Sequence, residues 1–172
     1  MAKAARGFPP VVDAGIETLI LGSFPSIASL GKQQYYGHPQ NQFWRLVGTA
    51  IGVPLAEMDY AARTRALLAH RIGLWDVIGA CRRAGSLDAD IRDARHNDFA
   101  PVTHVAKRLR RVCFNGKTAA RRQAEFAALG YETCVLPSSS PAYTLPFDQK
   151  LAAWRAVAAP LRAASRRTRK PC

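Results

Sequence analysis

Four short runs of apolar residues, separated by helix-like segments, constrain the fold more than any other feature of this sequence. The runs are ETLILGS (17–23), RIGLWDVI (71–78), RVCFNG (111–116) and ETCVLPS (132–138). Each is almost continuously apolar rather than alternating, which is typical of parallel strands covered on both faces. We therefore predict four strands of one central, mainly parallel sheet.

The segments between and after these runs have helical character. They span residues 41–52, 56–70, 99–110, 117–130 and 146–164. Gly130 is a helix-stopping residue, Pro146 suits a helix start, and Pro160 is expected to kink or break the last helix. Strands that alternate with helices predict an α/β fold, here a three-layer α/β/α sandwich around a four-stranded sheet.

Length and charge narrow the class of protein. A chain of 172 residues suits one domain with a sizeable core, so we assign residues 1–165 to a single domain and 166–172 to a basic C-terminal tail. Lys and Arg number 25 against 12 Asp and Glu, a net charge of +13. Such an excess attracts polyanions, most often nucleic acid. The alternative explanation for part of this positive charge is a genome whose proteins are generally rich in Arg and Ala.

Several classes of protein are not supported. No run of about 18 uncharged apolar residues is present, and the N-terminus MAKAARGFPP lacks a secretory pattern, so we expect a cytoplasmic protein without a membrane span. The four cysteines, Cys81, Cys113, Cys134 and Cys172, form no Cys-x-x-Cys pair, and no His-x-x-x-His pair exists. We therefore predict no metal site and no cofactor, and a monomer.

Ligands of parallel sheets bind beyond the carboxyl ends of the strands. This rule selects four predicted loops, at residues 22–41, 76–97, 115–118 and 137–144.

Two common catalytic motifs fail in these loops. A phosphate-binding Gly-x-x-x-x-Gly-Lys-Ser/Thr motif around FNGKT requires Gly at position 111, where the chain has Arg. Ser138, Ser139 and Ser140 follow a strand, but the Gly-x-Ser-x-Gly motif of serine hydrolases is missing. The segment LPSSSPAY is either a rigid loop whose hydroxyls grip phosphates or an ordinary capped loop.

The segment YYGHPQNQFW, residues 35–44, favours nucleobase chemistry. An enzyme that acts on a base takes it out of the helical stack into a pocket, where aromatic faces and amides contact it. Tyr35, Tyr36 and His38 are candidates for one wall of such a pocket, whereas Phe43 and Trp44 are expected to be core residues. For the adjacent amide of Asn41, an ordinary helix cap is the competing interpretation.

Taken together, six segments resemble the uracil-DNA glycosylase superfamily, above all its hypoxanthine-DNA glycosylase branch. They are LILGSFPS, YYGHPQNQFW, GLWDVIGACRRAGSLDADI, NDF, FNGKT and LPSSSPA, within residues 7–154. The resemblance implies the α/β/α sandwich, a cofactor-free enzyme, and DNA containing a deaminated base, hypoxanthine or uracil, as substrate. It also implies hydrolysis of the base–sugar bond, which leaves an abasic site. A non-catalytic nucleic-acid-binding module on the same fold is the alternative.

The resemblance also implies roles for single residues. In GSFP, Phe24 stands where the superfamily usually has a polar side chain that positions water, and the similar branch relies instead on the Asn of Pro-x-Asn-x-Phe-Trp. We therefore assign catalysis to Asn41, with Ser23. The expected base-binding residues are Phe24, Tyr36, His38, Asn115 and Asp76, and the expected DNA-binding residues are Ser138, Ser139, Ser140, Pro141, Ala142 and Tyr143. Tyr143 departs from the small polar residue expected there, and Asp76 as a turn cap is the competing interpretation.

Overall fold

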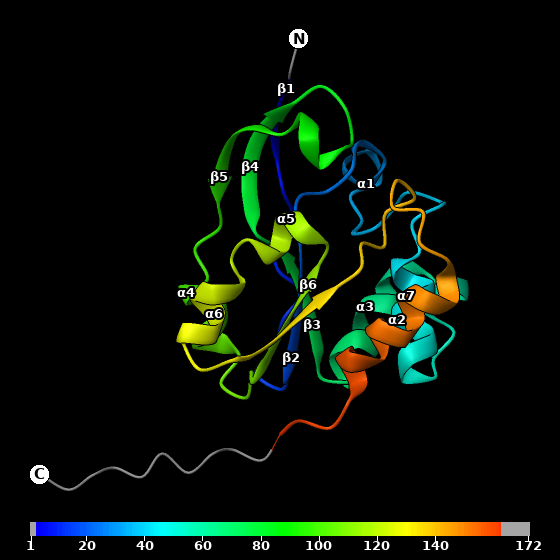
Figure 1. The fold of residues 1–172 in the computed structure, drawn as a ribbon, viewed down its shortest axis with the longest axis vertical. Helices are drawn as coiled ribbons and strands as arrows, with labels where there is room; N and C mark the ends of the chain where they lie inside the picture. The colour runs from blue at the N-terminus through cyan, green and yellow to red at the C-terminus, as the bar shows by residue number, and fades with distance from the viewer. Residues whose placement is uncertain (1–2, 163–172) are drawn as a thin grey trace, which may run out of the picture.

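The computed structural model describes residues 3–162, so the basic tail at 166–172 lies outside the described residues. Its centre is a four-stranded sheet in the order β3-β2-β6-β7, and all three strand pairings are parallel (Figure 1). The strands are β2 (Thr18–Gly22), β3 (Ile72–Asp76), β6 (Arg111–Asn115) and β7 (Glu132–Leu136). In register, Leu21 pairs with both Trp75 and Phe114, so the carboxyl ends of the strands lie side by side.

Helices cover both faces of this sheet, which confirms the predicted three-layer α/β/α sandwich (Figure 1). One layer contains α2 (Phe43–Ile51), α3 (Tyr60–Ala69) and α7 (Phe147–Trp154). The other contains α4 (Ala100–Val105), α5 (Lys117–Ala120) and α6 (Gln123–Ala128). A short helix, α1 (Ile27–Lys32), and three 3₁₀ turns, η1 (Leu55–Glu57), η2 (Asp88–Asp90) and η3 (Arg155–Ala158), lie in the connections.

The helix boundaries differ from the sequence expectations at two places. The segment at 117–130 forms two helices, because the chain turns at Arg121 and Arg122. The last helical segment stops at Ala158, two residues before Pro160, whose ring excludes a further helical turn. Phe43 and Trp44 at the start of α2 are almost fully buried, which confirms them as core residues.

A second sheet was not predicted. β1 (Lys3–Arg6), β4 (Ile78–Arg83) and β5 (Arg92–His96) form an antiparallel sheet in the order β1-β4-β5. The prediction of one strand over 71–78 is therefore wrong, because β3 ends at Asp76 and β4 begins two residues later. The prediction of a single loop over 76–97 is wrong for the same reason. Every residue of β5 is exposed, so this strand leaves no apolar signal in the sequence.

The hydrophobic core lies between the parallel sheet and its helices. Its largest fully buried side chains include Phe43, Phe114, Phe126 and Trp154, and a network of edge-to-face ring contacts joins several of them. This rigid centre fixes the strand ends from which the pocket described below is built. Between residues 3 and 162, every helix is too short or too polar to cross a lipid bilayer.

Candidate active site

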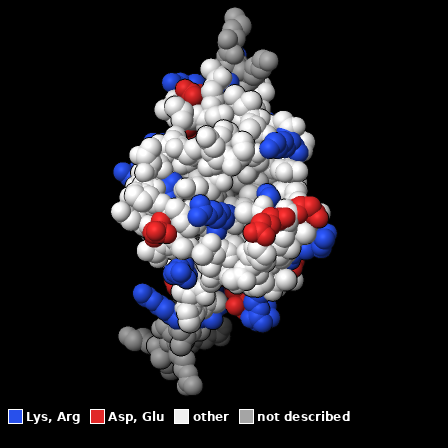
Figure 2. Space-filling view, turned by 90° about the vertical axis from the view of Figure 1, so that its right-hand side faces the viewer, with Lys and Arg blue, Asp and Glu red and all other residues white. Residues whose placement is uncertain are grey.

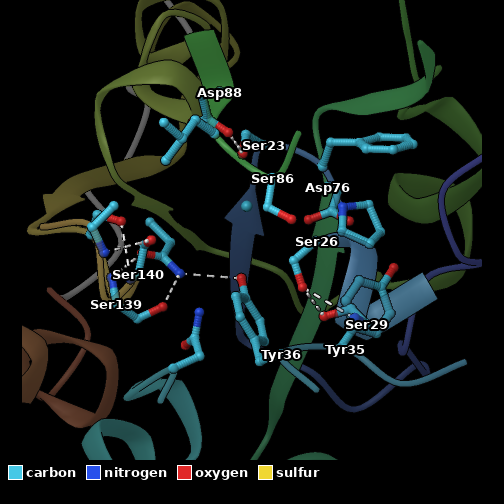
Figure 3. Close-up of a pocket in the computed structure, with 18 of the residues that line it drawn as sticks. Ser23, Ser26, Ser29, Tyr35, Tyr36, Asp76, Ser86, Asp88, Ser139 and Ser140 are labelled. Atoms are coloured by element: carbon cyan, nitrogen blue, oxygen red, sulfur yellow. Dashed lines mark hydrogen bonds between the residues drawn. The ribbon is translucent and has the colours of Figure 1, made fainter. Parts of the chain in front are cut away.

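A pocket of about 260 Å³ opens at the carboxyl ends of the four parallel strands (Figure 3). This volume is several times the roughly 30 Å³ that one water molecule occupies in the liquid. All four loops selected from the sequence contribute to the walls. The residues that line the pocket at the strand ends and in the loops after them include Gly22, Ser23, Phe24, Tyr35, Tyr36, Asn41, Asp76, Asn115, Ser138, Ser139, Ser140, Ala142 and Tyr143.

The floor of the pocket depends on a glycine at the end of β2. A methyl group on Gly22 would lie 2.5 Å from Asp76 Oδ1 and 2.8 Å from the Tyr36 hydroxyl oxygen. Real Cβ atoms almost never come this close to another heavy atom. The absence of a side chain at Gly22 therefore lets a carboxyl group and a phenol group converge at the bottom of the pocket.

Asp76 is a buried carboxyl group at the end of β3. Its side chain bonds to nothing among residues 3–162, and Oδ2 is completely buried. Burial, reinforced by the negative charge of Asp88 and opposed by the positive charge of Arg83, raises the pKa of Asp76 to about 7. Near neutral pH this group is available both as a proton donor and as an acceptor. Such a group in a cleft is typical of a functional site.

Tyr36 forms a fixed aromatic wall. Its ring stacks on Phe43 with centroids 3.7 Å apart and planes 9° from parallel, and its backbone has a positive φ of 54°. The left-handed conformation is uncommon for a residue with a bulky side chain, and such backbone strain is concentrated at functional sites. Burial raises the pKa of the Tyr36 phenol further above its ordinary value, so the hydroxyl stays protonated.

Asn115 ties the end of β6 to the loop after β7. Its Nδ2 donates to Ser139 Oγ at 2.9 Å and to the Tyr36 hydroxyl at 3.3 Å, and its Oδ1 accepts from the Ser139 backbone N–H at 2.9 Å (Figure 3). Ser139 is 1% exposed and its carbonyl accepts from the Gln42 backbone N–H. Both amide hydrogens of Asn115 are therefore used within the protein.

Asn41 sits on the pocket wall with its amide orientation fixed. Its Oδ1 accepts a hydrogen bond of 2.9 Å from the Phe43 backbone N–H at the start of α2. A backbone N–H only donates, so the oxygen must face the helix and the Nδ2 group must face away from it. Among the described residues, no acceptor binds Nδ2. The N-cap position of α2 is Gln42, so the helix-cap interpretation of Asn41 is wrong in its position. Asn41 lies one residue earlier, where its Oδ1 holds the first N–H of the helix while its Nδ2 has no partner among the described residues.

Two of the expected site residues do not line this pocket. His38 lies in an adjoining cavity of about 500 Å³, which shares Tyr36 and Asn41 with the pocket. His38 Nδ1 accepts from the Gln40 backbone N–H, so Nε2 carries the ring proton when the imidazole is neutral. Pro141 is exposed on the loop between Ser140 and Ala142.

A group of pocket residues on and next to α1 and η2 was not predicted from the sequence. Ser26 caps α1 by accepting from the Ser29 backbone N–H, a pattern that a Ser-x-x-Ser spacing could have indicated. Ser23 Oγ donates to Asp88 Oδ1 at 2.6 Å and thereby joins the loop after β2 to the turn between β4 and β5. The lining residues that were not predicted are Gly22, Pro25, Ser26, Ser29, Ser86, Leu87 and Asp88.

A buried cation lies behind the pocket wall. The guanidinium carbon of Arg83 is 5.5 Å from the ring centroid of Phe24. None of its three nitrogens has a hydrogen-bond partner within the part of the chain that the structure describes. Burial lowers the pKa of Arg83, although nearby carboxyl groups, including those of Asp88 and Asp76, partly oppose this effect.

No cluster of three His, Cys, Asp or Glu side chains suited to a metal ion occurs among residues 3–162. The functional groups that line the pocket are amides, hydroxyls, aromatic rings and carboxyl groups.

Comparison with known proteins identifies the family to which the chain belongs. Residues 9–160 match the family model described as the uracil DNA glycosylase superfamily. The chain belongs to the uracil-DNA glycosylase superfamily. It is therefore a DNA glycosylase, an enzyme that hydrolyses N-glycosyl bonds, with DNA as its substrate. In this superfamily member, the pocket lies at the carboxyl ends of the parallel strands.

Two relatives of this glycosylase are named hypoxanthine DNA glycosylase. The protein from Methanosarcina acetivorans is 49% identical over 88% of this chain and 96% of its own length, and that from Methanosarcina barkeri is 44% identical over 87% and 94%. A solution NMR structure from Methanosarcina acetivorans, assigned to a candidate uracil DNA glycosylase, superposes with a TM-score of 0.82 at 48% identity, covering 90% of this chain and 96% of that one. The resemblance to the hypoxanthine branch is confirmed.

Proposed function

We propose that this glycosylase removes hypoxanthine, and uracil where the pocket accepts it, from DNA by hydrolysis of the N-glycosidic bond. The free amide group of Asn41 on the wall of a base-sized pocket carries this proposal. The names of the two relatives, both hypoxanthine DNA glycosylase, support the choice of base. They also favour an enzyme over the non-catalytic binding module.

Selection of a deaminated base rests on Asp76. Hypoxanthine and uracil each present a ring N–H beside a carbonyl, whereas adenine presents an unprotonated ring nitrogen beside an amino group. The Oδ1 atom of Asp76 lies at the pocket floor next to Gly22. In its ionised form, which is favoured above pH 7, this carboxyl accepts from the ring N–H and repels the lone pair of adenine. Tyr36 offers its stacked ring as a platform for the base.

Bond cleavage needs little covalent chemistry from the protein. The bond between C1′ and the base nitrogen breaks, the electron pair leaves with the base, and a water oxygen adds to the oxocarbenium-like sugar. The proton lost by the water balances the proton gained by the base. We assign Asn41, with the loop at Ser23, to holding the water and the departing base, because preorganised dipoles stabilise charge that develops in the transition state.

Asn115 acts in this scheme mainly through other residues. Its amide hydrogens hold Tyr36 and Ser139, so it positions the aromatic wall and the loop that ends at Tyr143. Asn115 Oδ1 already accepts one hydrogen bond from Ser139, and its second lone pair can accept another from the edge of the base. Tyr143 is 43% exposed at the pocket rim, where DNA would meet it first, and buried Ser139 holds the loop from below.

The test uses duplexes that contain one deoxyinosine or one deoxyuridine opposite each partner base, followed by alkaline cleavage of abasic sites. We expect strand breaks at deoxyinosine and none at deoxyadenosine in the same sequence. Retention of the DNA on a gel without any breaks would overturn the proposed activity. We also propose that the activity belongs to the monomer.

A further inference from the structure

The antiparallel sheet β1-β4-β5 has one packed face and one open face. In β4, Cys81 and Arg83 are buried, whereas Arg82 between them is exposed. Side chains of a strand alternate between faces, so Arg82 points away from the core. Residues paired across an antiparallel ladder share a face, and the register therefore identifies which residues of β1 and β5 lie beside Arg82.

Four arginines share the open face. Along one rung, Ala4 pairs with Arg82 and Arg82 with Arg92; along the next, Arg6 pairs with Ala80 and Ala80 with Arg95. Ala80 and Arg82 are two apart on β4 and point the same way, whereas Arg92 and Arg95 are three apart on β5, because the register shifts at a bulge between the rungs. With the extra residue taken up by the bulge, the paired residues of both rungs lie on the Arg82 side. Arg6, Arg82, Arg92 and Arg95 are all exposed, and we call this set the arginine face.

The positive charge of the arginine face is not neutralised by ion pairs. Arg82 and Arg92 are direct cross-strand neighbours, an arrangement of like charges that destabilises a sheet. Among residues 3–162, no carboxylate lies within 4.0 Å of any of the four guanidinium groups, and Arg92 bonds only to the carbonyls of Ala89 and Ile91. Asp93 is the one acidic residue of β5.

The surface over the helical layer of α2, α3 and α7 has a different distribution of charge. Figure 2 faces the layer of α2, α3 and α7, and there basic and acidic side chains are interspersed with wide uncharged areas. A grouping of four arginines held together against their repulsion points to an anionic partner.

The arginine face is close to the pocket along the chain. Arg82 precedes Ser86 by four residues, Arg92 follows Asp88 by four, and both Ser86 and Asp88 line the pocket. Four residues span at most about 13 Å, the length of an extended chain, and the bends at 84–87 and the turn η2 shorten these separations. Phosphates on one DNA strand are spaced about 3.4 Å apart along the helix axis, so the arginines lie within about four base-pair steps of the pocket residues.

We propose that the arginine face binds backbone phosphates of the duplex that flanks the extruded nucleotide. This proposal rests on the proposed function, which places DNA at the pocket. The arginines contact phosphates and not bases, so the interaction is independent of sequence and strengthens duplex binding without altering the chemical step.

The test compares two triple variants with equal loss of charge. One is Arg82→Gln/Arg92→Gln/Arg95→Gln; the control is Arg65→Gln/Lys107→Gln/Arg155→Gln, at exposed positions on α3, before β6 and on η3. Affinity for an undamaged 30-base-pair duplex is measured against salt concentration. We expect the slope of log affinity against log salt to fall by about two to three for the first variant and by less than one for the control. Excision from a five-nucleotide single strand should stay within twofold of wild type.

If the slope of log affinity against log salt were the same in the arginine-face variant and in wild type, the proposal would be overturned. The arginine face would then be assigned to an acidic protein instead of DNA. An equal fall in both triple variants would also overturn it, by showing that only net charge matters. A defect on the five-nucleotide substrate would place the effect in the pocket instead. Because affinity is measured on undamaged duplex, absence of base excision by wild type refutes the proposed function separately.

Discussion

The buried carboxyl group of Asp76 should make the stability of this glycosylase depend on pH. Its pKa is about 7 in the folded protein against an ordinary value of 3.8. The folded state thus binds the proton more tightly, and stability is lost as the pH rises from about 4 to about 7. At 1.36 kcal/mol per pH unit, Asp76 should lower the free energy of unfolding by about 2.5 kcal/mol between pH 5 and pH 8.

Urea unfolding of wild type and Asp76→Asn at pH 5 and pH 8 measures this contribution. The variant should lose about 2.5 kcal/mol less than wild type over this interval, because the amide does not titrate. Asp148→Asn removes an exposed carboxyl at the start of α7 and should follow wild type. If Asp76→Asn and wild type had equal pH dependence, Asp76 would not be the perturbed group, and the account of the pocket floor would be wrong.

Three further predictions follow from the pocket geometry. Gly22→Ala should abolish excision, measured on a deoxyinosine duplex, because the methyl group would displace Asp76 and Tyr36; activity near wild type would contradict the close approach. Arg83→Met should fold with a midpoint of thermal unfolding at or above that of wild type, since its guanidinium is buried without hydrogen bonds; a loss of more than about 2 kcal/mol would refute this. Tyr143→Ala should slow excision severalfold on duplex and little on single-stranded DNA, and equal effects on both would exclude insertion into the duplex.

The apolar runs predicted the central sheet because buried parallel strands leave a continuous hydrophobic signal. The same signal could not reveal β5, whose residues are all exposed, or the break at Val77 between β3 and β4. The antiparallel sheet, and with it the turn that brings Asp88 to the pocket, was therefore missed.

The site was predicted in part. The rule for strand ends placed Asp76 and Asn115 at the pocket, and the family resemblance singled out Asn41. Sequence spacing did not reveal that the Asn115 amide group donates its hydrogen bonds to Tyr36 and Ser139. It also did not reveal that His38 lines an adjoining cavity. These facts depend on side-chain directions in loops, which local sequence patterns do not determine.

In the proposed mechanism, the Asn41 amide holds the water and the departing base during base release. The most direct test of this role is single-turnover excision of hypoxanthine from duplex DNA by Asn41→Ala under saturating enzyme. Loss of the hydrogen bond from the Phe43 backbone N–H to Asn41 should lower the free energy of unfolding by about 1 kcal/mol, which leaves a protein of ordinary stability folded. Gln40→Ala removes the neighbouring exposed amide outside the pocket and serves as the matched control.

We predict that Asn41→Ala releases the base at least about a hundredfold more slowly than wild type, with duplex affinity nearly unchanged, as for the loss of one preorganised donor. Gln40→Ala should excise at close to the wild-type rate. Base release by Asn41→Ala within a few-fold of wild type would contradict the account.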